Sequence, residues 1–224
     1  MEKPEILAQT ADYAVIFKPA GLPCQLKSAF SGYTLESELK LKLGKNKIFF
    51  PHRLDKITSG LLIVAFDKDT VEFFNNEIRN KRLGKYYLAL TESKINDPHT
   101  LIGLQKRYIK VHDDNSEIVR SGGLPSFLEI LSVEPAPGNN ECFHVLIRLL
   151  TGRMHQIRVM LADMGIPLCG DRLYNPGSKY KEFYLESIVL KFTDPENIEQ
   201  RFYYKNPKRI IEISETIKAF LNTL

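Results

Sequence analysis

A carboxylate stands directly before a long apolar run in this chain. The segment 51–60 contains Asp55, and the next six residues, 61–66, are all apolar. Such a run, ending at charged residues, predicts a strand that is buried on both faces. A carboxylate beside this strand would be partly shielded from water, which costs free energy unless a cation lies near it. Because shielded carboxylates are common at functional sites, Asp55 is a candidate catalytic residue, although it also fits a turn-forming residue before a strand.

The segment 151–158 gathers side chains that bind anions. Arg153, His155, Gln156 and Arg158 surround the expected start of a helix that runs to about residue 164. Helix N-termini and guanidinium groups both favour anions, and an arginine is well suited to keep a buried carboxylate ionised. Arg158 is therefore a candidate partner of Asp55. The pair also fits a purely structural salt bridge at a turn, because structural ion pairs perturb carboxylates as well.

A third candidate group lies at the start of the expected strand 86–90. Side chains alternate along a strand, so Tyr87 can point into a cleft while Leu88 points into the core. Lys85 precedes them and adds a positive charge. The alternatives stay open here, because Tyr87 also fits an ordinary core position, and His52 and His155 each fit simple hydrogen-bonding roles.

The elements that must position these residues alternate irregularly along the chain. A helix is expected at 35–43, with Thr34 as N-cap and Gly44 as its C-terminal stop, and another at 69–81, with Asp69 as N-cap. In the helix before Gly165 the apolar stripe leaves Arg158 to one side. A hairpin tip is expected at 113–115. Further strands are expected at 14–17, 127–133, 143–150, 184–192 and 201–205. This order predicts an α+β fold with a mixed, mainly antiparallel sheet.

Composition limits the classes of function. The net charge is +4, and lysines and arginines stand beside aromatic residues at several places, as in Lys106–Lys110 around Tyr108. This arrangement suits phosphate contacts and base stacking, although each cluster alone also fits a solvated surface. No apolar stretch is long enough for a membrane span, and no metal-ligand spacing or nucleotide-binding motif is present. Three widely spaced cysteines indicate free thiols in a reducing, cytoplasmic compartment.

Four motifs in order resemble the RluA-type family of RNA pseudouridine synthases. They cover most of the chain, from about residue 10 to 208. According to the resemblance, the second motif contains the catalytic aspartate. The third motif contains a tyrosine of the active site, and the fourth contains an arginine of the active site. The motifs are Lys18-Pro19-Ala20-Gly21-Leu22, His52-Arg53-Leu54-Asp55-Lys56 with 58–62, Lys85-x-Tyr87-x-Ala89, and 151–159 followed by 165–174.

The resemblance implies a bent, mixed sheet flanked by helices and loops, with the active-site cleft across its middle. It implies one catalytic domain over 1–224, without a separate N-terminal RNA-binding domain. The implied reaction breaks the C1′–N1 bond of an RNA uridine, rotates the base and joins C1′ to C5. Asp55 would be the nucleophile or base, Tyr87 would stack on the target base, and Arg158 would pair with Asp55. No cofactor and no metal are implied.

The implied partner is a structured RNA, either a tRNA or an rRNA. The small size and the lack of an exposed apolar stripe predict a monomer. Arg53 is expected to enter the gap that the flipped nucleotide leaves. Further RNA contacts are expected from His52, Lys85, Arg153, His155 and Gln156. The chain departs from the family pattern at Met160, at Asn175 where glycine often follows the tyrosine, and at 185–187. These departures affect substrate details more than the catalytic trio.

Two other classes of function remain to be weighed. A non-catalytic RNA-binding or RNA-remodelling protein on the same fold would have no chemical need for Asp55, Tyr87 and Arg158 together. A sugar or nucleotide hydrolase would usually need a second carboxylate or a metal. Neither is evident in the sequence near Asp55.

Overall fold

The computed structural model describes residues 2–26, 32–206 and 213–223. The chain forms two compact units, the first made of residues 1–85 and 186–204 and the second of 86–185 and 205–224. Asp55 therefore belongs to the first unit, and Tyr87 and Arg158 belong to the second.

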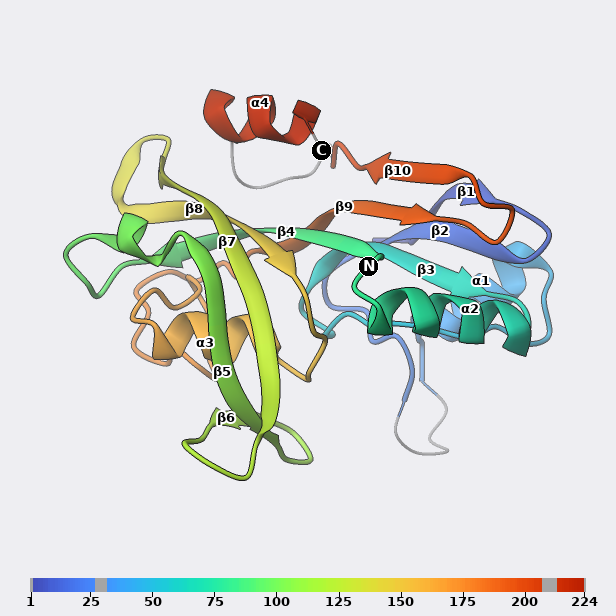
Figure 1. Cartoon of the computed structure of the whole chain (residues 1–224), viewed down its shortest axis with the longest axis horizontal. Helices are drawn as coiled ribbons and strands as arrows, with labels where there is room; N and C mark the ends of the chain where they lie inside the picture. The colour runs from blue at the N-terminus through green and yellow to red at the C-terminus, as the bar shows by residue number, and fades with distance from the viewer. Residues whose placement is uncertain (1, 27–31, 207–212, 224) are drawn as a thin grey trace. The chain divides into compact units, whose positions relative to one another are not determined.

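The first unit contains a sheet in the order β1-β2-β3-β9, with β10 paired to β9 (Figure 1). Its strands are β1 (Glu5–Gln9), β2 (Tyr13–Lys18), β3 (Ser59–Ala65), β9 (Leu185–Thr193) and β10 (Glu199–Tyr203). The pairs β1/β2, β2/β3 and β9/β10 are antiparallel, whereas β3 and β9 run parallel. The expected strands at 14–17, 61–66, 184–192 and 201–205 are confirmed within one or two residues.

The parallel contact between β3 and β9 depends on a glycine. Gly60 has a φ of 120° and faces Ser187 across the two strands. A Cβ at this position would lie 2.3 Å from the carbonyl oxygen of Ser187. Only a residue without a side chain allows the two main chains to approach so closely. Gly60 thus fixes the start of β3, five residues after Asp55.

An aromatic cluster forms the core on one face of this sheet. Phe74, on α2 (Lys68–Arg79), packs edge-to-face against Tyr13 and Phe192, with ring centroids 5.4 Å apart in both pairs. Residues Gly60 to Ala65 of β3 are all buried, as the apolar run predicts. Burial of such side chains contributes about 1.5–3 kcal/mol each. The strand that follows Asp55 is therefore firmly anchored.

The two helices of the first unit begin at side-chain caps. Helix α1 (Leu35–Leu43) has the predicted bounds: the N–H of Ser37 donates to Thr34 Oγ1 at 3.1 Å, and Gly44 is left-handed with a φ of 62°. The N-cap predicted for α2 at Asp69 is wrong. Asp67 is the N-cap, because its backbone is extended and its Oδ1 accepts from the N–H of Thr70 at 2.7 Å.

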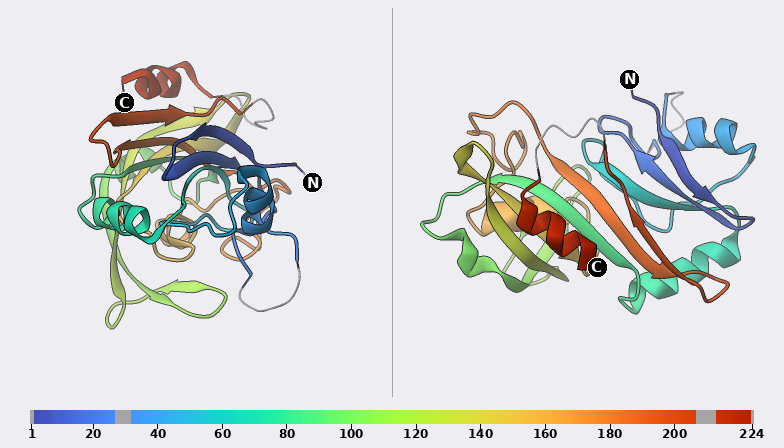
Figure 2. Two further views of the ribbon diagram at one scale, coloured as in Figure 1. Left: turned by 90° about the vertical axis from the view of Figure 1, so that its right-hand side faces the viewer. Right: turned by 90° about the horizontal axis from the view of Figure 1, so that it is seen from above.

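The second unit contains an antiparallel sheet in the order β4-β8-β7-β5-β6. Its strands are β4 (Gly84–Glu92), β5 (Gly103–Val111), β6 (Ser116–Ile118), β7 (Leu124–Ala136) and β8 (Asn139–Leu149), with the short 3₁₀ helix η1 (Pro98–Leu101) before β5. The tip between β5 and β6 covers the predicted residues 113–115. Helices α3 (Gln156–Asp163) and α4 (Glu215–Thr223) lie on opposite faces of this sheet (Figures 1 and 2).

Both sheets fit the predicted α+β class. The second is antiparallel throughout, and the first is antiparallel except where β3 meets β9. The prediction of a mixed, mainly antiparallel sheet is confirmed. Helix α4 was not expected from the sequence, although Ile217 and Leu221 give it a buried side. In the described part of the chain, no helix has the length and apolar character that crossing a membrane requires.

Candidate active site

Asp55 lies half-buried in the loop that leads into β3. Its carbonyl oxygen accepts a hydrogen bond from the N–H of Thr58 at 3.1 Å, which closes a turn just before the strand. The neighbouring Leu54 is buried, so the loop is anchored by an apolar side chain as well. Asp55 is therefore carried by a main chain with little freedom to move.

Lys18 fixes this loop from the end of β2. The residue is completely buried, and its Nζ donates to the carbonyl oxygens of Leu22 at 2.8 Å, Pro19 at 3.0 Å and Lys56 at 3.2 Å. Three donors on one ammonium group thus meet three main-chain acceptors. Because Lys56 follows Asp55 directly, Lys18 joins the loop 19–22 to the loop of the candidate catalytic carboxylate.

Burial lowers the pKa of Lys18 to about 8, although the charges of Cys24 and Asp55 act in the opposite direction. No such role follows from the sequence pattern, in which Lys18 stands only as the first residue of the first motif. A lysine at the end of a fully buried strand was the available signal, since lysine is rarely buried without several partners.

The two residues before Leu54 differ in their surroundings. His52 Nε2 accepts the N–H of Ile63 at 3.2 Å, and burial together with the charge of Lys85 lowers the pKa of His52 to about 3. His52 is therefore neutral near pH 7 and supports β3 at Ile63. Arg53 is exposed, as the predicted RNA contact requires. The RNA-binding roles of both residues stay predictions.

Lys85 and Tyr87 are buried on β4, and each is 4% exposed. Tyr87 pairs with Ile147 on β8, and Leu88 beside it is completely buried. Burial also lowers the pKa of Lys85 to about 8. The strand therefore holds the tyrosine firmly, while its stacking on a base stays a prediction.

Helix α3 begins later, and is more buried, than its sequence pattern predicts. His155 is left-handed, with a φ of 54°, and the helix starts at Gln156. The prediction that Arg158 lies off the buried stripe is wrong. Residues 156–161 are all buried, because α3 is covered on more than one side. Arg158 retains only 5% of its surface exposed and must have polar partners inside the unit.

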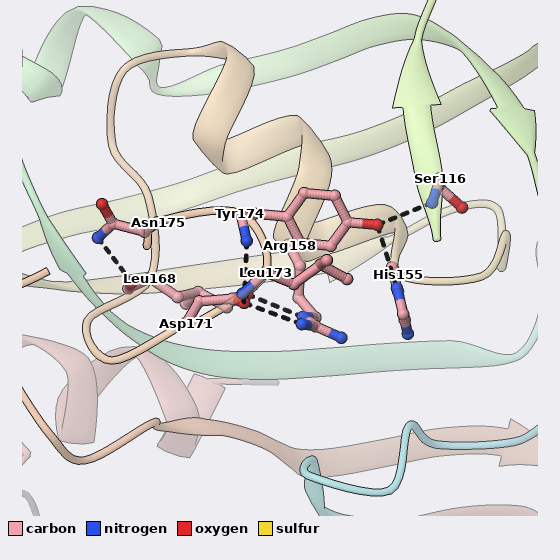
Figure 3. A network of polar contacts seen from close by, with 8 residues as sticks. All are labelled: Ser116, His155, Arg158, Leu168, Asp171, Leu173, Tyr174 and Asn175. Carbon is pink, nitrogen blue, oxygen red and sulfur yellow. Dashed lines mark hydrogen bonds and ion pairs between the residues drawn. The ribbon is translucent and has the colours of Figure 1, made fainter. Parts of the chain in front are cut away.

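Asp171 is a charged partner of Arg158 within the second unit. Arg158 Nε donates to Asp171 Oδ2 and Nη2 donates to Oδ1, both at 2.8 Å (Figure 3). The N–H groups of Leu173 and Tyr174 also donate to Oδ1, at 3.0 and 3.2 Å. Burial opposes the ionisation of Asp171, but Arg158 and the two N–H groups outweigh it and hold the pKa of Asp171 below its usual value. The pairing of Arg158 with Asp55 that the resemblance implies stays a prediction.

Tyr174 extends this network towards the turn before α3. Its ring lies 5.0 Å from the Arg158 guanidinium carbon, and its hydroxyl oxygen accepts the N–H of Ser116 at 2.8 Å (Figure 3). The same hydroxyl lies 3.1 Å from His155 Nδ1. His155 is thus held in place, although half-buried, and its RNA contact stays a prediction.

Gln156 and Arg153 stabilise the turn that opens α3. The Gln156 Oε1 accepts from Thr151 Oγ1 at 2.8 Å and from the N–H of Arg153 at 3.1 Å, while its Nε2 donates to the carbonyl oxygen of Phe127 at 3.0 Å. These contacts give Gln156 a structural role. Arg153 is half-buried, and its Nε has no hydrogen-bond partner among the described residues. Their predicted RNA contacts are not tested by this geometry.

The described residues offer little for a metal or a reactive thiol. No group of three or more His, Cys, Asp or Glu side chains in this part of the chain could hold a metal ion. Cys24, Cys142 and Cys169 are free and buried. Cys24 Sγ donates to the carbonyl oxygen of Leu54 at 3.4 Å and so adds to the packing beside Asp55.

Comparison with known proteins identifies the family. The model of the family described as RNA pseudouridylate synthase matches residues 12–163. The chain belongs to this family. An uncharacterized RNA pseudouridine synthase of Haemophilus influenzae is 31% identical over 191 residues, which are 84% of this chain and 81% of that protein. A second, from Mycoplasma genitalium, is 31% identical over 212 residues, and the chain spans 64% of its length.

Solved structures agree with the fold. The human protein RNA pseudouridylate synthase domain containing 1 matches with a TM-score of 0.75 and 22% identity, over all of this chain and 96% of its own. Human RNA pseudouridylate synthase domain containing 4 matches with a TM-score of 0.69, also at 22% identity, over 91% and 89% of the two chains. The predicted fold class and the predicted family, that of RNA pseudouridine synthases, are both confirmed. Members of this enzyme class are isomerases that act on RNA.

Proposed function

We propose that this protein converts uridine to pseudouridine in a structured RNA, either a tRNA or an rRNA. Asp55 is the nucleophile or base, Tyr87 stacks on the target base, and Arg158 supplies a cation. The observation that carries the proposal is the half-buried carboxylate of Asp55 on a loop that Lys18 holds through main-chain carbonyls, within the segment that matches the family. The whole trio lies inside the matched residues 12–163.

The reaction needs no external reactant. The C1′–N1 bond of the uridine breaks, the C1′–C5 bond forms, and the proton at C5 is lost while N1 gains one, so the product is an isomer. A base inside an RNA helix must first be flipped out, at a cost of a few kcal/mol. A stacking aromatic ring and basic side chains offset that cost. A carboxylate is already ionised at neutral pH and so can act without a separate activating base.

Basic and aromatic side chains on the β5–β7 pair support an RNA substrate. Lys106 Nζ lies 5.1 Å from the ring centroid of Tyr108, which is exposed, and 5.8 Å from that of Phe127. Such groups can contact phosphates and stack on bases. The proposal includes a monomer working in the cytoplasm, where the three free cysteines would stay reduced.

The first experiment identifies the RNA and then tests Asp55. Pseudouridines are mapped in total tRNA and rRNA from cells with and without the gene, and the RNA that loses a pseudouridine is transcribed unmodified. The Asp55→Asn variant should lose product formation by a factor of 10³ or more while binding this RNA within about threefold of wild type. Asp69→Asn, at an exposed carboxylate on α2, is the matched control and should keep full activity.

The outcomes separate the competing functions. Continued turnover by Asp55→Asn contradicts the role of Asp55. If wild-type protein binds RNA but no pseudouridine depends on the gene, the non-catalytic RNA-binding protein is the better description. If the wild-type protein hydrolyses free nucleosides or sugars instead, it is better described as a hydrolase.

A further inference from the structure

We infer that Asp171 is a positioning residue for the reaction, because it fixes the plane and direction of the Arg158 guanidinium. The inference rests on the proposed role of Arg158. Asp171 lies in the second part of the fourth motif, 165–174, beyond residues 12–163, which the family model covers, and no role follows for it from the motif alone. Its support is the geometry of the second unit.

The contact between the two side chains is a two-point contact. Arg158 Nε and Nη2 each donate to a different oxygen of Asp171, both over 2.8 Å. Two parallel hydrogen bonds set the rotation of a planar guanidinium as well as its distance. Because this edge is occupied, Arg158 can act on another anion only through its remaining edge.

The rings around Arg158 restrict the guanidinium further. The guanidinium carbon lies 5.0 Å from the ring centroid of Tyr174 and 5.7 Å from that of Phe183. Both are cation–π contacts, which favour a guanidinium near the face of a ring. The guanidinium thus contacts a carboxylate and two aromatic rings, and the two hydrogen bonds to the carboxylate set its direction.

The carboxylate that directs Arg158 is itself rigid. Asp171 is 1% exposed, and two N–H groups of its own loop donate to its Oδ1. The N–H of Asn175 donates to the carbonyl oxygen of Asp171 at 2.8 Å, which closes the loop. Both the carboxylate and the main chain of this loop are held by hydrogen bonds. The position of the loop therefore determines the position of the Arg158 guanidinium.

Asn175 fastens this loop to the sheet. Its Nδ2 donates to the carbonyl oxygen of Leu168 at 3.1 Å (Figure 3). The same Nδ2 also donates to Glu92 Oε1, at the end of β4. Its Oδ1 accepts from Lys94 Nζ at 3.0 Å. A glycine, which the family pattern often has here, could make none of these side-chain contacts. Asn175 therefore ties the loop to β4.

Stability alone does not account for the buried pair. Replacing a buried ion pair with apolar residues of similar volume is often neutral or stabilising. A fixed cation is useful where charge must be placed accurately, since a displacement of about 1 Å at a reacting centre costs on the order of 10²-fold in rate. The pair is therefore best explained by the requirement to aim Arg158.

The test separates the chemical step from binding and folding. Single-turnover rates and RNA dissociation constants are measured for Asp171→Asn and Asp171→Glu with the unmodified transcript that wild type modifies. Asp171→Asn should slow the chemical step by about 10–100-fold while the dissociation constant changes less than threefold. Asp171→Glu, which keeps the charge, should recover part of the rate.

Asp194 provides a matched control in the first unit. It is also a buried aspartate, 4% exposed, and it accepts from the N–H of Ile198 at 2.9 Å and from Gln200 Nε2 at 2.9 Å, but its contacts are with hydroxyl and amide groups. Asp194→Asn should lower the melting temperature yet leave the single-turnover rate of the folded protein within twofold. Near-ultraviolet circular dichroism gives the folded fraction of each variant.

Each outcome bears on the inference. A wild-type rate in Asp171→Asn overturns it, and so does a loss no greater than that of Asp194→Asn at equal folded fraction. If Asp171→Asn does not fold, the inference is tested with Asp171→Glu, which keeps the charge. A reduced single-turnover rate with an unchanged dissociation constant then supports the positioning role. An unchanged rate contradicts it. If the wild-type protein modifies no RNA, the proposed function is wrong. This outcome is distinct from any difference between the wild-type protein and the Asp171 variants.

Discussion

The loop that carries Asp55 and the helix that carries Arg158 are held in two different ways. The first is held by its main chain: Lys18 binds three carbonyl oxygens, His52 accepts an N–H of β3, and Gly60 lies against Ser187. The second is held by pairs of side chains. Main-chain contacts fix where a loop runs, whereas side-chain pairs fix where one functional group points.

The two cations differ in charge compensation as well. Lys18 has neutral acceptors around its Nζ, so burial lowers its pKa to about 8. Arg158 has a carboxylate, and the pair remains ionised on both sides. A cation that supports a loop can tolerate partial neutralisation. A cation that is used as a charge needs a permanent counter-ion and a guanidinium that does not titrate.

The largest effect is expected where two main chains meet. Gly60→Ala should lower the free energy of unfolding by about 4 kcal/mol or more, because the new Cβ would lie 2.3 Å from the carbonyl oxygen of Ser187. Gly21→Ala is the control: Gly21 has a φ of 84° but no atom within 4 Å of its ideal Cβ, so only backbone strain of about 1–2 kcal/mol is expected. Urea unfolding measures the free energy of unfolding of both variants. Equal losses of stability would show that β3 and β9 can move apart to accommodate the new Cβ.

The next effect compares the two cations directly. Arg158→Met should cost about 3–5 kcal/mol, because it leaves the buried charge of Asp171 without its partner. Lys18→Met should cost less, about 1–3 kcal/mol, because its three hydrogen-bond acceptors are neutral carbonyls and Asp55, whose charge also acts on Lys18, is only half-buried. Both are measured by urea unfolding at pH 7. A larger loss for Lys18→Met would reverse the comparison between the two regions.

Acid should weaken the support of the Asp55 loop. His52 has a folded-state pKa of about 3 and an ordinary value of 6.5, so the unfolded chain binds the proton first as the pH falls. The stability that His52 contributes is complete above pH 6.5 and is lost between pH 6.5 and 3. Allowing for partial exposure, the loss is about 2–3 kcal/mol relative to His52→Gln. The exposed His112→Gln serves as control, and a pH-independent difference for His52 would contradict its neutral, buried state.

A smaller effect is expected at high pH, where stability should again rise with pH. Lys18 has a folded-state pKa of about 8 against 10.5 for an ordinary lysine, so burying its charge costs free energy at pH 8 and below. This cost disappears as the pH rises from about 8 to 10.5. The resulting gain in stability is partly offset, because neutral Lys18 has one hydrogen-bond donor fewer. Wild type should therefore gain about 1–2 kcal/mol relative to Lys18→Met across this range. A difference that falls with pH would mean that the three hydrogen bonds outweigh desolvation.

The sequence by itself determined several local elements and the family. The bounds of α1 follow from Thr34 and Gly44, because a cap and a left-handed glycine act within a few residues. The buried strand β3 follows from its apolar run, because a continuous apolar segment has no face to turn to water. The four motifs indicated the family, since their order along the chain is itself specific. Asp55 was identified in this way before any contact was known.

Only the tertiary structure decided how the candidate residues are held. Asp171 is thirteen residues from Arg158, and Lys56 is thirty-eight from Lys18, so neither contact is visible in a local pattern. The helical period assumes one buried face, and it failed for α3 because neighbouring elements cover more than one side of this helix. The sequence supplied the reactive groups. Packing between distant segments supplied the partners that orient them, because burial of a charge is settled by whatever the fold brings next to it.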